Sequence, residues 1–286
     1  MPALGRIGIW SMELRFGDPQ AAARSAAELD ELGYRALWIP GGMGGDITGD
    51  IDRLLDATTH ATIATGILNI WMHDPAEIAS WWKALPDARQ RRVLLGLGVS
   101  HAHIVGEAYA KPLAAMEAYL DRLDAEGLPA EARCLAALGP KMQALARERS
   151  CGIHPYLISP EHTQSARAVL GPGKLLAPEQ GVVLDSDPAT AREKARGALS
   201  HYLQYPNYRN SWIRLGFDVE EIDAMSDRLV DSLFAWGDAA AITARLDEHW
   251  AAGADHVCIQ AITGQGLDPT APMAAWRALA GAGSSA

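Results

Sequence analysis

The feature that most constrains the fold of this chain is a regular alternation of short apolar runs with amphipathic helical patterns. Most of these runs are continuously apolar, as expected for strands of a parallel sheet that is covered on both faces. The predicted strands are residues 6–10, 34–39, 62–71, 93–99, 133–138, 152–158, 181–184 and 256–262. A strand followed by a helix, eight times over, predicts an α/β fold of the (β/α)8 TIM-barrel type. A doubly wound open sheet is the alternative, but it usually has fewer strands and leaves a second domain.

The helical segments carry their own start signals, because a capping residue followed by proline favours the first turn of a helix. This pair occurs at Asp18-Pro19, Asp74-Pro75, Ser159-Pro160 and Asp187-Pro188. Residues 185–255 show helical patterns and no predicted strand, so we interpret them as a helical insertion and crossover between strands 7 and 8. No linker-like boundary interrupts the chain, and residues 1–286 are predicted to form a single domain.

Composition excludes several classes of protein. The 286 residues are 49% hydrophobic and 21% charged, and the formal charge of −10 disfavours a broad surface for nucleic acid or an anionic membrane. No apolar run reaches the roughly 18 residues of a membrane span. The N-terminus shows no export signal, and the three cysteines form no CxxC pair, so a cytoplasmic protein is expected. No zinc-enzyme histidine motif occurs, and no metal site is predicted.

Active sites of barrels lie where the strands end, which directs attention to three segments. The first, residues 94–101, reads LLGLGVSH. Gly98 lacks a Cβ and would let a flat ring approach the backbone, with Ser100 and His101 offering hydrogen bonds at the rim. The alternative is a glycine pair that serves packing, followed by a polar loop. A dinucleotide fingerprint is disfavoured because the third glycine is missing.

The second segment, residues 137–142, reads ALGPKM and starts a predicted helix. Gly139 has no side chain to occupy the first N–H groups of the helix, Pro140 has no N–H, and Lys141 adds a positive charge. This arrangement predicts a small anion pocket suited to a phosphate. The alternative is an ordinary helix start with an exposed lysine.

The third segment, residues 64–75, is long for a barrel strand and contains Gly66, which indicates a bulge or a close approach of ligand to backbone. Asn69, Trp71 and His73 follow at alternate positions, so they share one side if the strand continues. Trp71 is a candidate wall of a pocket, and packing beneath the next helix is the alternative.

Together these segments resemble the luciferase-like monooxygenase superfamily, and in particular its branch of coenzyme F420-dependent oxidoreductases. The resemblance covers nearly the whole chain, and the order and spacing of the segments carry it. The segments are LGYRALWIPGG (32–42), ATGILNIWMHDPAEIA (64–79), LLGLGVSH (94–101), KPLAAMEAYLD (111–121), ALGPKM (137–142), HPYLISPEH (154–162), SDRLVDSLFAWGD (226–238) and AGADHVCIQ (252–260).

The resemblance implies that the mouth formed by the strand ends binds coenzyme F420, or FMN as in some relatives. In the family a non-prolyl cis peptide on the third strand backs the ring system, and the matching bond here is Gly66–Ile67. The loop after the fourth strand would contact the ring or the chain beyond it, and the helix start after the fifth would hold the phosphate. The implied cofactor site consists of Gly66, Ile67, Asn69, Gly98, Val99, Ser100, His101, Gly139, Pro140, Lys141 and Met142.

The chain departs from the family at its candidate acid–base residues. Relatives often place a histidine after the second strand and a glutamate after the fourth, whereas residues 39–42 here read IPGG and His101 stands near the position of the glutamate. The substrates of those relatives are therefore not carried over. His101 is the first candidate proton donor or acceptor, because an imidazole titrates near neutral pH. Glu13 and His73 are further catalytic candidates, and Trp71 is assigned to the substrate pocket.

The expected function is hydride transfer between coenzyme F420 and a small organic substrate. An FMN-dependent monooxygenase is the first alternative, followed by a non-redox phosphate-binding barrel and a non-catalytic cofactor-binding protein. We expect no nucleic-acid or membrane partner. A homodimer is expected because relatives associate through barrel helices, and Trp81 and Trp82 are predicted to be exposed on a helix.

Overall fold

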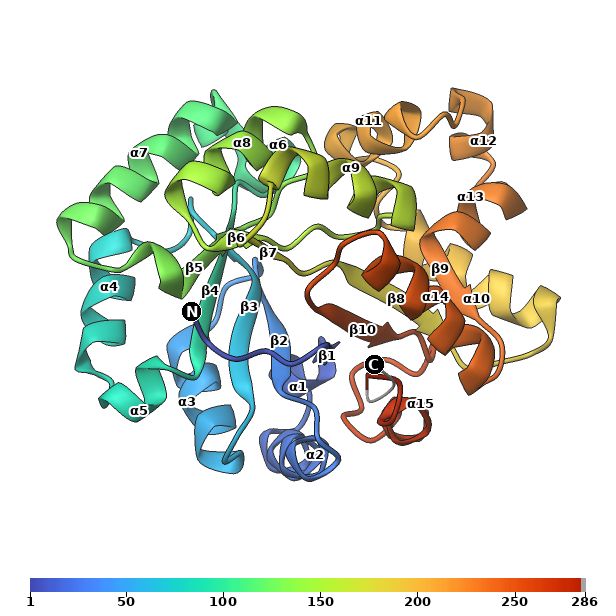
Figure 1. Cartoon of the computed structure of the whole chain (residues 1–286), viewed down its shortest axis with the longest axis horizontal. Coiled ribbons are helices and arrows are strands. Elements are labelled where there is room, and N and C mark those ends of the chain that lie inside the picture. Colours follow the sequence, from blue (N-terminus) through green and yellow to red (C-terminus); the bar gives the residue numbers. More distant parts are fainter. Residues whose placement is uncertain (284–286) are drawn as a thin grey trace.

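The computed structural model describes residues 1–283, apart from the side chains at positions 103 and 108. Its centre is one curled sheet of ten parallel strands in the order β7-β6-β5-β4-β3-β2-β1-β10-β8-β9, with helices outside it (Figure 1). The strands are β1 Ile7–Trp10, β2 Ala36–Gly41, β3 Thr62–Asn69, β4 Val93–Gly98, β5 Arg133–Leu135, β6 Gly152–Ile153, β7 Leu175–Leu176, β8 Glu179–Val183, β9 Phe234–Trp236 and β10 Val257–Ala261. The predicted α/β architecture with a parallel sheet is confirmed.

Helices connect successive strands except β7 and β8, and the four predicted proline starts open α2, α4, α9 and α10. The aspartates before three of these prolines accept a hydrogen bond from a main-chain N–H in the first turn. The helices are α1 Glu13–Phe16, α2 Pro19–Glu31, α3 Ile47–Ala57, α4 Pro75–Ala84, α5 Asp87–Gln90, α6 Ala102–Val105, α7 Pro112–Ala125, α8 Pro140–Arg149, α9 Pro160–Leu170, α10 Pro188–Ser200, α11 Pro206–Arg214, α12 Val219–Asp223, α13 Asp227–Leu233, α14 Ala239–Ala251 and α15 Met273–Leu279.

The sheet has ten strands rather than the eight predicted, and the two that were missed are β7 and β9. Only Ala177 and Pro178 separate β7, which pairs with β6, from β8, which pairs with β10. This short stretch of chain therefore links the two sides of the sheet. Its proline and the polar Glu179 broke the apolar run on which the sequence prediction relied.

The second missed strand, β9, lies within residues 185–255, for which only helical patterns and no strand were predicted. The helical segment ends at Leu233, and Phe234 opens a strand that pairs with Gly181 of β8. Residues 185–233 are otherwise helical, and α10 to α13 pack around their own apolar cluster, which contains Trp212 (Figure 1).

Successive strand residues alternate between two further cores. Leu37 and Ile39 of β2 pack outward with the surrounding helices, whereas Trp38 between them packs inside the curled sheet with the three cysteines. All three cysteines are free and buried, and burial raises the pKa of the Cys151 thiol to about 12. They are therefore unreactive packing residues, as expected from their apolar surroundings.

Trp81 and Trp82 on α4 are half-buried and pack against the outer core, so the expectation that they are exposed is wrong. The Trp81 indole also donates to the carboxylate of Asp52 at 3.4 Å. These indoles consequently give no support to the predicted homodimer. Among residues 1–283, no helix is long and apolar enough to cross a membrane.

Candidate functional site

A cavity of about 580 Å³ opens at the edge of the sheet where β3, β4, β5 and β6 end. Its volume lies within the range of small-molecule sites, and it occupies the position where barrel enzymes carry their active sites. Helix α11 closes it from the side of the helical segment. The wall is formed by Ile67, residues 98–101, Tyr109, Pro112, residues 136–139, Lys141, Met142, residues 154–156, Asn207, Tyr208, Asn210 and Arg214.

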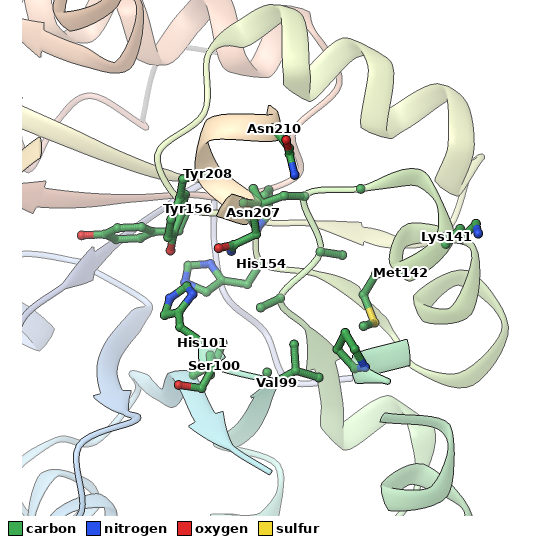
Figure 2. Close-up of a pocket in the computed structure, with 18 of the residues that line it drawn as sticks. Val99, Ser100, His101, Lys141, Met142, His154, Tyr156, Asn207, Tyr208 and Asn210 are labelled. Atoms are coloured by element: carbon green, nitrogen blue, oxygen red, sulfur yellow. The ribbon is translucent and has the colours of Figure 1, made fainter. Parts of the chain in front are cut away.

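The two ends of this cavity differ in character. Figure 2 shows His101, His154, Tyr156 and Tyr208 gathered at one end, which we call the aromatic end. Lys141 lies at the opposite end, beside the start of α8, which we call the anion end. Most of the predicted cofactor residues line the cavity, and Pro140 lines an adjoining hollow of about 350 Å³.

The wall between the two ends is built around the cis peptide bond between Gly66 and Ile67, which is present as predicted. Gly98 lies directly against the Ile67 side chain, and a Cβ at position 98 would come within 2.4 Å of Ile67 Cδ1. A Cβ at Gly96 would come within 2.0 Å of the Thr65 carbonyl oxygen. Close packing between β3 and β4 therefore requires both glycines. Ser100 then turns the chain in the left-handed conformation, with φ of 56°.

At the anion end, α8 begins at Pro140 without a side-chain cap. Gly139 at the N-cap has open space where a Cβ would stand, so the first N–H groups of the helix remain accessible. Lys141 is exposed beside them. Arg214 reaches the same cavity from α11 and donates to the Leu138 carbonyl oxygen at 3.2 Å. Sequence reasoning missed Arg214, because nothing local links α11 to the loop after β5.

At the aromatic end, α11 and the segment before it supply tyrosines that pack on His101. The imidazole of His101 stacks on Tyr205 with ring centroids 3.9 Å apart and an interplanar angle of 6°. Tyr156 follows β6 and donates to Gln260 Oε1 at 2.7 Å, because that oxygen only accepts. Tyr202 therefore donates to the Tyr156 hydroxyl across 3.0 Å. Tyr202, Tyr205 and Tyr208 lie within the predicted insertion, and none of them was selected as a site residue.

His154 is the second imidazole at the aromatic end, and the sequence analysis did not select it. It is fully buried, stacks on Trp38 at 4.2 Å, and donates through Nδ1 to the Ala177 carbonyl oxygen at 2.8 Å. Its Nε2 has no partner among the described residues. Burial lowers the pKa of His154 to about 4, so the ring is neutral near pH 7 and Nε2 is a hydrogen-bond acceptor.

Glu179 on β8 adds a buried carboxyl beneath the aromatic end. Its Oε2 accepts from the Leu157 N–H at 3.2 Å, while Oε1 has no partner within residues 1–283. Burial raises the pKa of Glu179 to about 8, partly offset by that hydrogen bond. The carboxyl therefore carries its proton near neutral pH. Its charge, once formed, raises the pKa of the Tyr202 and Tyr208 phenols, so the three groups lie within electrostatic reach.

Besides Pro140, five predicted site residues do not line the cavity: Gly66, Asn69, Trp71, His73 and Glu13. The Trp71 indole donates to the Val99 carbonyl oxygen at 2.8 Å and so supports the loop after β4. His73 Nε2 donates to the Gly41 carbonyl oxygen at 2.9 Å. Their predicted roles toward cofactor or substrate remain predictions.

The other three residues are held by local contacts. Asn69 Oδ1 accepts from the Trp71 N–H at 3.1 Å, and Gly66 lies against the Trp10 indole, which donates to its carbonyl oxygen at 3.3 Å. Glu13 accepts from the Ser11 hydroxyl at 2.6 Å, and burial raises the pKa of its carboxyl. Glu13 therefore lies just after β1 with a raised carboxyl pKa, and it is not one of the residues that line the cavity.

No family model matches the sequence, and no curated protein is similar to it in sequence. Solved structures are similar in fold. An F420-dependent secondary alcohol dehydrogenase, in complex with an F420-acetone adduct, is 15% identical with a TM-score of 0.71, over 94% of this chain and 97% of that one. The coenzyme F420-dependent tetrahydromethanopterin reductase of Methanopyrus kandleri is 16% identical with a TM-score of 0.71, over 94% and 98% of the two chains.

A flavin enzyme is similar to the same extent. The oxygenating constituent of 3,6-diketocamphane monooxygenase from Pseudomonas putida, in complex with FMN, is 12% identical. Its TM-score is 0.70, over 96% of each chain. At these identities the similarity shows a common fold, which extends over nearly the whole of the compared chains.

Proposed function

We propose that this chain is an oxidoreductase of the luciferase-like superfamily that binds coenzyme F420 and transfers a hydride between it and a small organic substrate. The observation that carries the proposal is the two-ended cavity at the strand ends. One end offers an uncapped helix start to a phosphate, and the other offers an apolar, aromatic space. The fold shared with two F420-dependent enzymes supports the assignment.

The residues present fit a phosphorylated tricyclic cofactor. The Lys141 and Met142 end of the cavity would hold the phosphate, because main-chain N–H groups and a cation meet there without a competing carboxylate side chain in the wall. Ile67 and Val99 would lie against the ring system, and the neutral His154 would present an acceptor nitrogen at the inner wall. The bound cofactor would supply the redox chemistry, while the protein orients it and excludes water.

FMN remains a second candidate, because an FMN enzyme shares the fold to the same degree. Both cofactors carry a phosphate, so the anion end does not distinguish them. In either case the curled ten-stranded sheet with its α11 cover would act as a variant of the barrel. His101 is proposed as the proton donor or acceptor beside the substrate.

The test is a fluorescence titration of the purified chain with coenzyme F420, FMN and riboflavin. We expect saturable binding of F420, weaker binding of FMN, and the weakest binding of riboflavin, which has no phosphate. Equal affinity for FMN and riboflavin would show that the phosphate does not contribute to binding. Failure of both F420 and FMN to bind would reject the proposed function.

A further inference from the structure

The loop between β5 and α8 is held from outside the cavity at a single carbonyl group. The Leu138 carbonyl oxygen accepts a hydrogen bond from His162 Nε2 on α9 at 3.1 Å and another from Arg214 on α11 at 3.2 Å. Leu138 and Gly139 line the cavity, whereas His162 does not. Two donors from two helices therefore converge on the peptide group that leads into the anion end.

The chemistry of His162 shows that more than packing is needed at this position. A carbonyl oxygen only accepts, so the ring proton is on Nε2 and Nδ1 is left as an acceptor. The residue is only 6% exposed, and Nδ1 has no partner among residues 1–283. Burial lowers the pKa of His162, with a smaller contribution from the Arg214 charge, so the ring is neutral near pH 7. An unpartnered buried acceptor destabilises the fold, and an apolar side chain would avoid that cost.

The contact with His162 fixes the direction in which the peptide between Leu138 and Gly139 faces. In a planar trans peptide the N–H is antiparallel to the C=O, so the Gly139 N–H is directed away from His162 and Arg214. Within residues 1–283, no main-chain oxygen accepts a hydrogen bond from this N–H. It is therefore free to meet a ligand in the cavity that Gly139 lines.

The same glycine makes this direction easy to lose. Half a turn of the peptide would move φ of Gly139 from −106° into the positive range, which glycine adopts without strain. The turn would put the Leu138 carbonyl oxygen where the Gly139 N–H now lies. A carbonyl oxygen carries partial negative charge and repels a phosphate, whereas an N–H attracts one.

We propose that His162 is a positioning residue of the anion end, which holds the Leu138 carbonyl so that the Gly139 N–H remains available to the phosphate of the ligand. The inference rests on the function proposed above and deepens it, because it names a residue that controls phosphate affinity from outside the cavity wall. Arg214 lines the cavity and could also contact the ligand directly, so His162 is the residue on which the positioning effect can be isolated.

The test compares FMN with riboflavin, which share one ring system and differ in the phosphate, on wild-type protein, His162→Met and His162→Gln. Methionine fills a similar volume without a donor, whereas glutamine carries an amide N–H at about the same reach as imidazole Nε2. Fluorescence titration should show His162→Met weakening FMN binding by about five- to tenfold, with riboflavin changed by less than about twofold. His162→Gln should restore FMN affinity to within about twofold of wild type.

Thr163→Val is the matched control on the same helix. Thr163 is buried beside His162, but its hydroxyl bonds to His249 and not to the loop before α8. This variant should leave the affinities for FMN and riboflavin within about twofold of wild type. Titration with inorganic phosphate, followed by phosphorus NMR, repeats the comparison without a cofactor. The dissociation constant for phosphate should rise in His162→Met by about the same factor as that for FMN.

Three results would overturn the inference: equal weakening of FMN and riboflavin by His162→Met, no recovery in His162→Gln, or the same loss of FMN affinity in Thr163→Val. Retained riboflavin binding shows that a variant is folded. If wild type prefers FMN to riboflavin and His162→Met leaves that preference unchanged, the positioning role fails and the proposed function stands. If wild type binds inorganic phosphate but neither F420 nor FMN, the proposed function fails, and the effect of His162→Met on phosphate still tests the positioning role.

Discussion

The two ends of the cavity treat charge in opposite ways. At the anion end, Lys141 is exposed and the start of α8 is open to solvent, so charges there are hydrated and screened. At the aromatic end, Glu179 and His154 are fully buried, and burial holds both in their neutral forms near pH 7. The difference teaches that one end can attract a charged group, while the other is suited to a neutral one.

The contrast arises from how the chain closes each end. The loop after β5 leaves the sheet and enters α8 within a few residues, so its first turn stays at the surface. The aromatic end is instead covered by α11, which comes from a segment more than 50 residues further along the chain. The α11 cover excludes water from the aromatic end only. This loss of hydration shifts the pKa values of Glu179 and His154.

The largest expected effect is at the aromatic end, from Glu179→Gln. The Glu179 carboxyl has a pKa of about 8 in the folded chain against 4.5 when exposed, so wild-type stability falls as pH rises between these values. Glutamine does not ionise. The free energy of unfolding of Glu179→Gln relative to wild type should therefore increase by about 4 kcal/mol between pH 5 and pH 9.

Urea unfolding at the two pH values measures this change. Any fixed cost of placing an amide beside Leu157 cancels in the comparison between pH values. Glu117→Gln on the exposed face of α7 is the control, and its relative stability should not depend on pH in this window. If the free energy of unfolding of Glu179→Gln relative to wild type were the same at both pH values, water would reach the Glu179 carboxyl. The two ends of the cavity would then no longer differ in burial.

The second effect is at the anion end, from Gly139→Asp. Aspartate is a favoured N-cap and open space surrounds this position, so the free energy of unfolding should stay equal or rise by up to about 1 kcal/mol. The same carboxylate occupies the first N–H groups and repels a phosphate. Affinity for F420 or FMN should fall by about 100-fold, equivalent to roughly 2.7 kcal/mol.

Gly139→Asn separates the two causes, because asparagine caps the helix without a charge. It should cost much less affinity than aspartate, and riboflavin should bind all three proteins alike. If aspartate at position 139 left phosphate-bearing cofactors bound as tightly as before, the start of α8 would not be the phosphate site.

The start of α8 at Pro140 was predictable from sequence because its signal is local. A strand, Gly139, Pro140 and Lys141 follow one another, and their conformations depend on neighbours in the chain. The aromatic end was not predictable in this way. Glu179 lies on β8 and His154 follows β6, and their neutral states depend on burial that only the folded chain creates.

The same distinction explains the errors within the fold. Alternation placed Asn69, Trp71 and His73 on one side of a continuing strand, but β3 ends at Asn69 and a turn follows, in which the Met72 N–H bonds to the Asn69 carbonyl oxygen. The strands β7 and β9 have two and three residues, too few for periodicity to be visible. The longer strands, the helices that begin at proline and the overall α/β class were predicted correctly. Each of them leaves a pattern in the sequence that extends over more residues than β7 or β9 contain.

The smallest expected effect, from Lys141→Gln, gives the finest measure of the contrast. The Lys141 ammonium is exposed, so it should contribute about two- to fivefold to the affinity for F420 or FMN at low salt. At roughly 0.5 M salt the Debye length falls to only a few ångströms, and the difference between Lys141→Gln and wild type should disappear. A Lys141→Gln effect that persisted at high salt would mean that the anion end is closed to solvent when the cofactor is bound. The two ends would then differ in the charge of the groups they present, and no longer in their exposure to water.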